Sequence, residues 1–300
     1  MHLPPALSLE IDYLAIGHPT IDEGTPQGDV IGGTVLYASV QAARLGWRAG
    51  LVGRGNAGEL APLLTAVAGE VTATLQPAEH TTRFRNVSDG DQRTQWVRAL
   101  APPLDLTPAG VAAGEGGPAR ARVLHVAPVA QEVDLGRAAA AVEADIVGVT
   151  PQGLIRRWGE DGRVVHVPLA LAAVRAEATE RLDVVVVADE ERPFVEALTR
   201  AVRRQGGLVV VTKGSQGCLV ETAAGGQMVT ALPVVEAVDR TGAGDVFAAG
   251  LLVGLAEGRE VAAAVRFAMA AASCSIEGVG PAAVAPRAAI ERRLAAAPRA

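Results

Sequence analysis

The chain has 300 residues, of which 49% are hydrophobic and 20% are charged. This composition is typical of a folded globular protein and excludes a disordered chain, which lacks the apolar surface needed for a core. The 27 basic and 33 acidic residues give a net charge of −6, and aromatic residues make up only 3%. Because there is also no long run of one sign, we expect neither a nucleic-acid partner nor an anionic membrane partner.

The N-terminal sequence and the cysteines favour a cytoplasmic location. The opening Met-His-Leu-Pro-Pro lacks the basic and apolar regions of a signal peptide. The most apolar stretch, residues 262–276, includes Arg266 and is too short to span a bilayer. Cys218 and Cys274 lie far apart in the sequence and suit neither a disulfide framework nor a metal clip, as is usual in a reducing compartment.

Short apolar runs alternate with longer Ala- and Leu-rich runs along the chain. The short runs are continuous, as expected for strands buried on both faces; they are Tyr13–Ile16, Ala49–Val52, Val123–Val126, Ile146–Val149, Val184–Val187 and Leu208–Val211. The longer runs predict helices over Val35–Leu45, Glu59–Val67, Leu135–Ala144, Pro193–Arg204, Val246–Glu257 and Val261–Ser275. This order predicts an α/β fold with a doubly wound, mostly parallel sheet, in a single domain over residues 1–300.

Two polar, strand-like runs break this order. Arg83–Val87 and Arg93–Val97 flank Ser88–Asp91, in which an Asp-Gly pair signals a hairpin. These runs are too polar for the central sheet, and Pro102 and Pro103 follow them, where a ladder cannot continue. We therefore expect a small, exposed β-sheet that acts as a lid. Its open edge is a candidate contact for a homodimer.

The segment with the most chemical content is Asp239–Asp245, which reads Asp-Arg-Thr-Gly-Ala-Gly-Asp and precedes an apolar helix. Its small residues permit a tight turn into the helix, whose positive dipole end suits a phosphoryl group. Three backbone amides would point outward there: those of Gly242, Ala243 and Gly244. Asp245 can accept the proton of an attacking hydroxyl. The alternative is an ordinary helix start with Asp245 as a first-turn acid, but Asp239 favours the functional interpretation.

This segment resembles the signature of the ribokinase-like, or phosphofructokinase-B type, carbohydrate kinases. Other segments agree in order: Asp22 follows the first strand, Gly32 and Gly33 precede a helix, and Thr212–Gly217 resembles the family's Thr-x-Gly-x-x-Gly loop. The resemblance covers nearly the whole chain. It implies transfer of the γ-phosphoryl group of ATP to an alcohol, with Mg²⁺, a K⁺ site, and lid segments at about 18–34 and 80–100.

The resemblance also implies a role for each matching residue. Asp245 would be the general base, with residues 242–244 as the anion hole. Substrate hydroxyls would be held by Asp22, Gly32 and Gly33. The nucleotide would lie near Thr212, Gly214, Gly217 and Met269. Asp239 would belong to the K⁺ site, and Glu191 would contact Mg²⁺ because it matches the last residue of the family's Asn-x-x-Glu pattern.

The identity of the acceptor is less closely defined. Thr150–Arg156 resembles a segment of inositol-kinase-like members, which makes Gln152 and Arg156 candidate contacts to a cyclic polyol such as myo-inositol. The alternative for Arg156 is a solvated helix charge. Tyr37 and Met269 stand where relatives often carry Asn. A ribose-like sugar, a nucleoside, and a binding sensor without catalysis therefore stay open as alternatives.

A GxGxxG pattern at Gly53–Gly58 follows a strand and precedes a helix, as in dinucleotide-binding folds, and Glu79 falls near the spacing of a ribose-binding acid. The sequence around Pro77 looks like a loop, so no second strand closes a βαβ unit. We favour a tight strand-to-helix turn. No P-loop, HExxH or GxSxG sequence occurs. His125 lies within a strand and is predicted to be buried and hydrogen-bonded.

Overall fold

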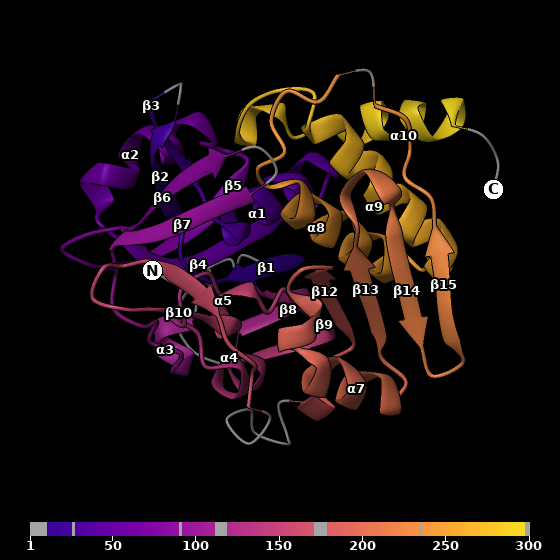
Figure 1. Ribbon diagram of the computed structural model, residues 1–300, viewed down its shortest axis with the longest axis horizontal. Helices are drawn as coiled ribbons and strands as arrows, with labels where there is room; N and C mark the ends of the chain where they lie inside the picture. Colours follow the sequence, from indigo (N-terminus) through magenta and orange to yellow (C-terminus); the bar gives the residue numbers. More distant parts are fainter. Residues whose placement is uncertain are drawn as a thin grey trace, which may run out of the picture.

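A computed structural model describes residues 11–25, 28–89, 92–111, 119–170, 179–234 and 236–297. A nine-stranded sheet crosses the molecule in the order β15-β14-β13-β12-β9-β8-β1-β4-β5 (Figure 1). Its strands are β1 Tyr13–Ile16, β4 Ala49–Gly55, β5 Val71–Pro77, β8 Ala119–Val126, β9 Val142–Val149, β12 Val184–Ala188, β13 Leu208–Thr212, β14 Cys218–Thr222 and β15 Gly225–Val229. All run in the same direction except β14, which pairs in an antiparallel manner with both β13 and β15, so the predicted mostly parallel sheet is confirmed.

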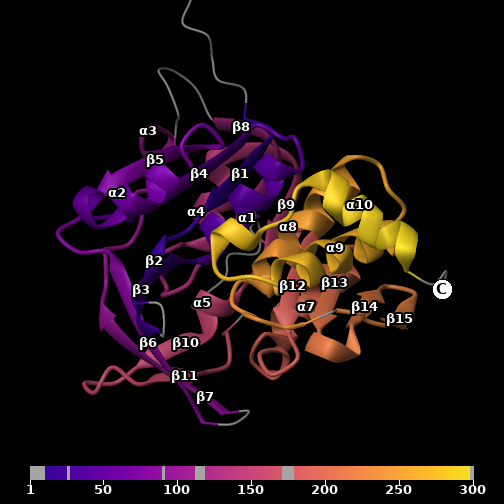
Figure 2. The ribbon, with the colours of Figure 1, turned by 90° about the horizontal axis from the view of Figure 1, so that it is seen from above.

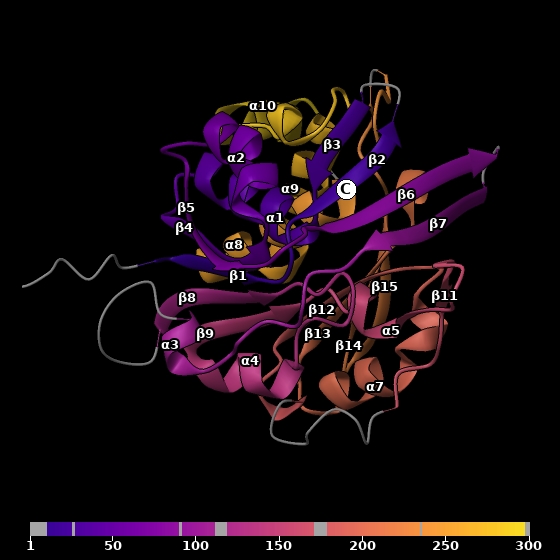
Figure 3. The ribbon, with the colours of Figure 1, turned by 90° about the vertical axis from the view of Figure 1, so that its left-hand side faces the viewer.

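Helices cover both faces of this sheet (Figure 3). One face carries α1 Thr34–Arg44, α2 Ala57–Ala66, α8 Ala243–Ala256, α9 Val261–Ser275 and α10 Arg287–Ala296, and the other carries α4 Leu135–Ala141 and α7 Glu196–Arg204. Successive strand residues serve the two cores in turn: Val184 and Val186 pack on one side, Val185 and Val187 on the other. This double burial explains the continuous apolar runs. No helix in the described ranges has the length and apolarity to cross a membrane.

A separate four-stranded sheet stands beside the carboxyl ends of the parallel strands (Figures 2 and 3). This small sheet has the order β3-β2-β6-β7 and consists of β3 Gly28–Gly32, β2 Thr20–Thr25, β6 Thr82–Asp89 and β7 Gln92–Ala99. The predicted hairpin is confirmed as β6 and β7, although its turn at 90–91 lies outside the described residues. That the small sheet acts as a lid stays a prediction.

A two-stranded ribbon and several short helical segments accompany the two sheets. A backbone bridge from Trp96 of β7 to Arg163 joins the small sheet to a two-stranded ribbon. The ribbon consists of β10 Arg156–Trp158 and β11 Val164–His166. Further helical segments among the described residues are α3 Pro108–Val111, α5 Gln152–Ile155 and the 3₁₀ turns Arg192–Phe194, Gly214–Gln216 and Pro281–Ala283.

Several predicted boundaries are wrong. The helix expected over Leu135–Ala144 ends at Ala141, because Val142 already pairs with Ala119 of β8. The helix expected from Pro193 is a 3₁₀ turn followed by α7. The helix predicted over Val246–Glu257 begins at Ala243, three residues earlier, so part of the glycine-rich segment forms its first turn.

The prediction that Gly53–Gly58 closes no βαβ unit is also wrong, because β5 pairs in parallel with β4 along its whole length. The preferred interpretation of a tight turn nevertheless agrees with the contacts. The side chain of Asn56 accepts hydrogen bonds from the amides of Gly58 and Glu59 at 2.9 and 3.2 Å. A side chain at Gly53 would lie 2.6 Å from Pro19. The glycine therefore permits close packing, and Asn56 occupies the amides that a phosphate would need.

Candidate active site

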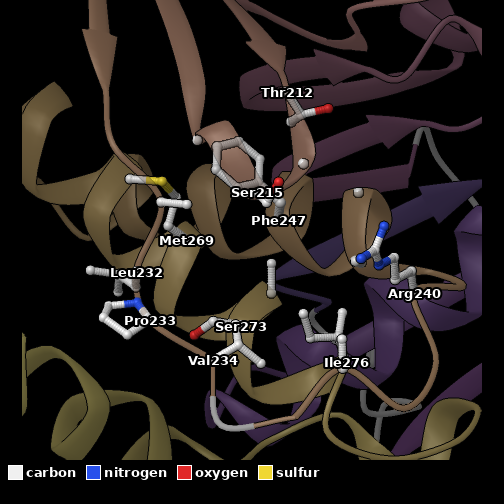
Figure 4. A pocket seen from close by; sticks show the side chains of 17 residues that line it. Thr212, Ser215, Leu232, Pro233, Val234, Arg240, Phe247, Met269, Ser273 and Ile276 are labelled. Carbon is white, nitrogen blue, oxygen red and sulfur yellow. The ribbon is translucent and has the colours of Figure 1, made fainter.

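A cavity of about 550 Å³ lies between the end of β13, the N-terminus of α8 and helix α9 (Figure 4). The four residues predicted to lie near a nucleotide all line it: Thr212, Gly214, Gly217 and Met269. Ala243 and Gly244 of the predicted anion hole line it as well. The structure thus brings three separate sequence segments to one cavity at the carboxyl edge of the sheet, where ligands bind in open α/β folds.

The two sides of the cavity differ in character. Leu232, Pro233 and Met269 gather on one side in Figure 4, while Arg240 lies on the other, near the start of α8. Ser273 faces the apolar side, but its hydroxyl donates to the carbonyl of Ala270 at 2.9 Å. The cavity therefore combines an apolar compartment, suited to a flat ring system, with a basic residue beside a helix N-terminus.

The N-terminus of α8 has the geometry of an anion site. Gly242 is the N-cap, in a left-handed conformation (φ 77°) that favours glycine. The amide of Ala243 donates to Arg240 at 3.3 Å, whereas the amide of Gly244 donates to no protein group in the described ranges. A side chain at Gly244 would meet nothing within 4 Å, so ligand atoms have access to this backbone. Asp245 lies in the same first turn.

Asp239 anchors the loop that leads into α8. Its carboxylate accepts a hydrogen bond from the amide of Thr241 at 2.8 Å, and the amide of Val238 donates to Ile276 at 2.8 Å. No group of three His, Cys, Asp or Glu side chains that could hold a metal ion occurs among residues with described positions. The K⁺ site beside Asp239 stays a prediction.

Asp22 lies on β2 of the small sheet and is held there by an amide relay. Asn86 donates to Asp22 Oδ1 at 2.8 Å, and Gln95 donates to Asn86 at 2.8 Å. Three of the four strands thus contribute to the orientation of one carboxylate. Asn86 is not among the site residues predicted from the sequence. The signal that reveals it is alternation, since Asn86 lies two residues from Phe84, the register partner of Asp22.

Gly32 and Gly33 connect the small sheet to α1. Gly33 caps α1 with φ 95°, and a side chain there would lie 2.7 Å from the carbonyl of His18. A side chain at Gly32 would lie 3.5 Å from both Asp22 and Tyr37. Close packing and the positive φ therefore require glycine at position 33, whereas a methyl group at position 32 would make ordinary van der Waals contacts beside Asp22, the predicted substrate residue.

Tyr37 links the acidic residues of the site. Its side chain is 2% exposed, and its hydroxyl has no hydrogen-bond partner in the described structure. Burial raises the pKa of Tyr37, and the negative charges of Asp239, Asp245 and Asp22 raise it further. Tyr37 therefore stays protonated, and it lies within electrostatic reach of carboxylates from the small sheet, from the loop before α8 and from α8 itself.

The side chains of Gln152 and Glu191 form a hydrogen-bonded pair. Gln152 donates to Glu191 Oε1 at 2.6 Å, and the amide of Ala188 lies 3.5 Å from the other oxygen. Glu191 is 5% exposed. Because its carboxylate is buried and already bonded, it presents no open ligand for Mg²⁺ in this conformation. The magnesium role of Glu191 and the substrate role of Gln152 stay predictions.

Arg156 is buried, so its interpretation as a solvated helix charge is wrong. The side chain is 8% exposed, donates to the carbonyl of Val129 at 2.9 Å and lies 5.2 Å from the ring centroid of Phe84. Because Phe84 pairs with Asp22, Arg156 supports the strand that carries the predicted substrate residue. Lys213, which follows β13, forms an ion pair in which its Nζ lies 2.5 Å from Oδ1 of Asp189.

Comparison with known proteins matches part of the chain to one family. Residues 173–288 match the pfkB family of carbohydrate kinases. The resemblance predicted from the sequence is thereby confirmed. The matched segment contains β12, β13, all residues that line the cavity, and α8.

Curated relatives agree over shorter segments. Inositol 3-kinase of Zea mays is 41% identical over 107 residues, 36% of this chain and 27% of the maize protein. Ribokinase of Bacillus subtilis (strain 168) is 44% identical over 70 residues, 23% of this chain and 24% of that protein. The chain thus spans about a quarter of the length of these relatives.

Solved structures show the same fold over nearly the whole chain. A pyrophosphate-dependent kinase in the ribokinase family, complexed with a pyrophosphate analog and myo-inositol, superimposes with a TM-score of 0.75. It is 19% identical, and the match covers 93% of this chain and 99% of that one. The predicted ribokinase-like fold is therefore confirmed.

Proposed function

We propose that the protein is a kinase that transfers the γ-phosphoryl group of ATP to a hydroxyl of a small sugar or cyclic polyol. The observation that carries this proposal is the meeting of an apolar cavity, an accessible helix N-terminus and Asp245 at one edge of the sheet. The pfkB match over this part of the chain supports it. Myo-inositol is the acceptor we favour, since an inositol 3-kinase is among the relatives.

The shape of the cavity supports a nucleotide as donor. Pyrophosphate needs only amides and positive charge, which Gly244 and Arg240 supply. It has no group to fill the compartment formed by Leu232, Pro233 and Met269. A nucleotide base fills such a compartment with its apolar faces. We therefore propose ATP over pyrophosphate, although a related fold uses pyrophosphate.

Asp245 is the general base of the proposed reaction. The acceptor oxygen attacks the γ-phosphorus, and a new P–O bond forms while the bond from the γ-phosphorus to the β,γ-bridging oxygen breaks. The acceptor proton moves to the Asp245 carboxylate, and ADP leaves with the bonding electrons. The α8 amides stabilise the charge that spreads over the phosphoryl oxygens.

A bound Mg²⁺ would neutralise charge on the donor phosphates, which commonly carry the metal with only one or two protein carboxylates. The described residues form no preassembled metal cluster, and Glu191 is bonded to Gln152. We therefore assign no step of the reaction to a residue acting through the metal. The residues of this chain position the reactants and exclude water.

The deciding experiment measures donor consumption with Mg-ATP and with Mg-pyrophosphate, each with and without K⁺. The acceptors are myo-inositol, ribose, fructose, adenosine and cytidine, and product is detected as phosphorylated acceptor. We expect product from ATP and a polyol or sugar. Product only from pyrophosphate would overturn the donor assignment, and a nucleoside product would overturn the acceptor class. Binding without any product would favour a sensor.

Asp245→Asn tests the base and should lower kcat by about 10²- to 10⁴-fold while ATP still binds. Asp134→Asn is the matched control. It makes the same substitution at the N-cap of α4, on the opposite face of the sheet, where Asn also caps well. Near-parental turnover in Asp245→Asn would refute the base assignment.

The outer strand β3 of the small sheet supports a homodimer, because among the described strands it pairs only with β2, which leaves its other edge open to a second copy. Sedimentation of the full chain tests this, and a monomer at micromolar concentration would refute it.

A further inference from the structure

The ring of Tyr37 lies directly against Gly242, the N-cap of α8. A methyl group placed on Gly242 would come within 2.4–2.6 Å of three ring carbons. Real atoms do not approach this closely, so the ring occupies the space where any side chain at position 242 would be. Gly242 also accepts the hydrogen bond of Val246 at 2.9 Å, which starts α8. The ring therefore supports the residue from which the anion site is built.

The same ring reaches the acceptor side of the site. Its Cε2 atom lies 3.5 Å from the position of a methyl group on Gly32, and so does Oδ2 of Asp22. Tyr37 follows Gly33 by one helical turn, and its amide bonds to the Gly33 carbonyl at 3.3 Å. The end of β3 and the start of α1 thus carry the ring, so any shift of β3 moves the surface on which Gly242 rests.

The hydroxyl of Tyr37 does not explain why a large side chain stands here. It is buried and forms no hydrogen bond within the described residues. A buried, unpaired hydroxyl normally destabilises a fold. What the side chain contributes to the observed structure is the flat face of its ring, packed between two glycines from different parts of the site.

We propose that Tyr37 is a positioning residue: its ring couples the acceptor-binding end of the small sheet to the amides of the anion site at the start of α8. This inference rests on the proposed kinase function and assigns the coupling to one side chain. Displacing reacting groups by about 1 Å can cost roughly 10²-fold in rate. The ring acts through Gly242 and need not touch either substrate.

The test compares Tyr37→Leu, which removes the flat ring, with Tyr37→Phe, which keeps it. We expect Tyr37→Leu to lower kcat by about 10- to 100-fold with the acceptor KM unchanged within about threefold, because the loss falls on the transition state. Tyr37→Phe should restore kcat to within about threefold of the parent. Val40→Ala, a truncation on the same helix in the same core, is the matched control for lost packing.

A second readout needs no turnover. Tripolyphosphate lacks a nucleobase and should bind through the anion site alone. Calorimetry should therefore show at least tenfold weaker tripolyphosphate binding to Tyr37→Leu than to Tyr37→Phe. A lowered melting temperature with unchanged kcat and unchanged tripolyphosphate affinity would reduce Tyr37 to a core residue and overturn the proposal. A raised acceptor KM alone would make it a substrate contact and also overturn it.

The two failures are distinguishable. If the parent transfers phosphate to no acceptor, the proposed function fails, and tripolyphosphate binding to the same variants still decides whether the ring supports the anion site. If the parent is active and the Leu and Phe variants behave alike, the kinase assignment stands and the role of Tyr37 is refuted.

Discussion

Acidification should destabilise the protein through His125, which sits in the centre of the main sheet. The ring is fully buried and bonds to the Tyr13 hydroxyl at 2.7 Å and to the Thr150 hydroxyl at 3.1 Å, which confirms the environment predicted for it. Both partners are neutral, so no charge compensates a proton on the ring. Burial lowers the pKa of His125 from 6.5 to about 3.

The magnitude follows from linkage. In the unfolded chain His125 takes up a proton near pH 6.5, whereas in the folded protein it does so only near pH 3. The stability that the protein gains from keeping His125 neutral is therefore fully present above pH 6.5 and is lost as the pH falls between these two values. The difference of about 3.5 pKa units corresponds to about 5 kcal/mol when fully developed, of which about 2 kcal/mol is lost at pH 5. This is a large part of a typical stability of about 5–15 kcal/mol.

Urea unfolding at pH 8, 7, 6 and 5 measures this dependence. His125→Gln keeps an amide donor and acceptor but cannot titrate, so its free energy of unfolding should fall by about 2 kcal/mol less between pH 8 and 5. Burial also lowers the pKa of His18, whose contribution remains in the variant. His80→Gln, at a side chain that is 60% exposed, is the control and should follow the parent. Parallel curves for His125→Gln and the parent would refute the reasoning.

Three further predictions concern the stability of the fold and the two sides of the proposed site. Glu132→Gln should lower the free energy of unfolding in urea by about 3 kcal/mol, because this buried carboxylate accepts bonds from the amides of His18, Val129 and Ala130 at 2.6–2.9 Å; an unchanged midpoint would contradict this. Gly217→Ala should abolish donor binding in calorimetry, because φ is 98° and the methyl would lie 2.0 Å from the carbonyl of Val229; normal affinity would show that the loop adapts. Asp22→Ala should raise the acceptor KM by about 10- to 100-fold and leave the ATP KM unchanged, as for a lost bond to a charged group; equal effects on both would place Asp22 outside the acceptor site.

The sequence predicts the strands and helices that are buried on both faces, because their apolar runs leave few alternatives. Boundaries are predicted less well where composition does not change. The Ala-rich run through Ala141 and Val142 passes from helix to strand without a loop, and only pairing with β8 decides where. Strand β5 was missed because an edge strand ending in Pro77 carries a weak apolar signal.

Residues within a contiguous motif were also predictable as a group, since the loop after β13 and the start of α8 each bring their residues to the cavity. Contacts between distant segments were not. The bond from Asn86 to Asp22 depends on the register between β6 and β2, and the packing of Tyr37 on Gly242 depends on how α1 crosses α8. Neither relation is encoded in local periodicity.

The residues of the proposed site are divided along the chain. Every residue lining the cavity falls within 212–276, whereas the proposed acceptor-side residues, from Asp22 to Arg156, all precede it. Under the proposed function, substitutions before residue 157 should therefore alter the acceptor without changing the residues that line the cavity. The pfkB match over 173–288 accordingly includes every residue that lines the cavity and none of the proposed acceptor residues.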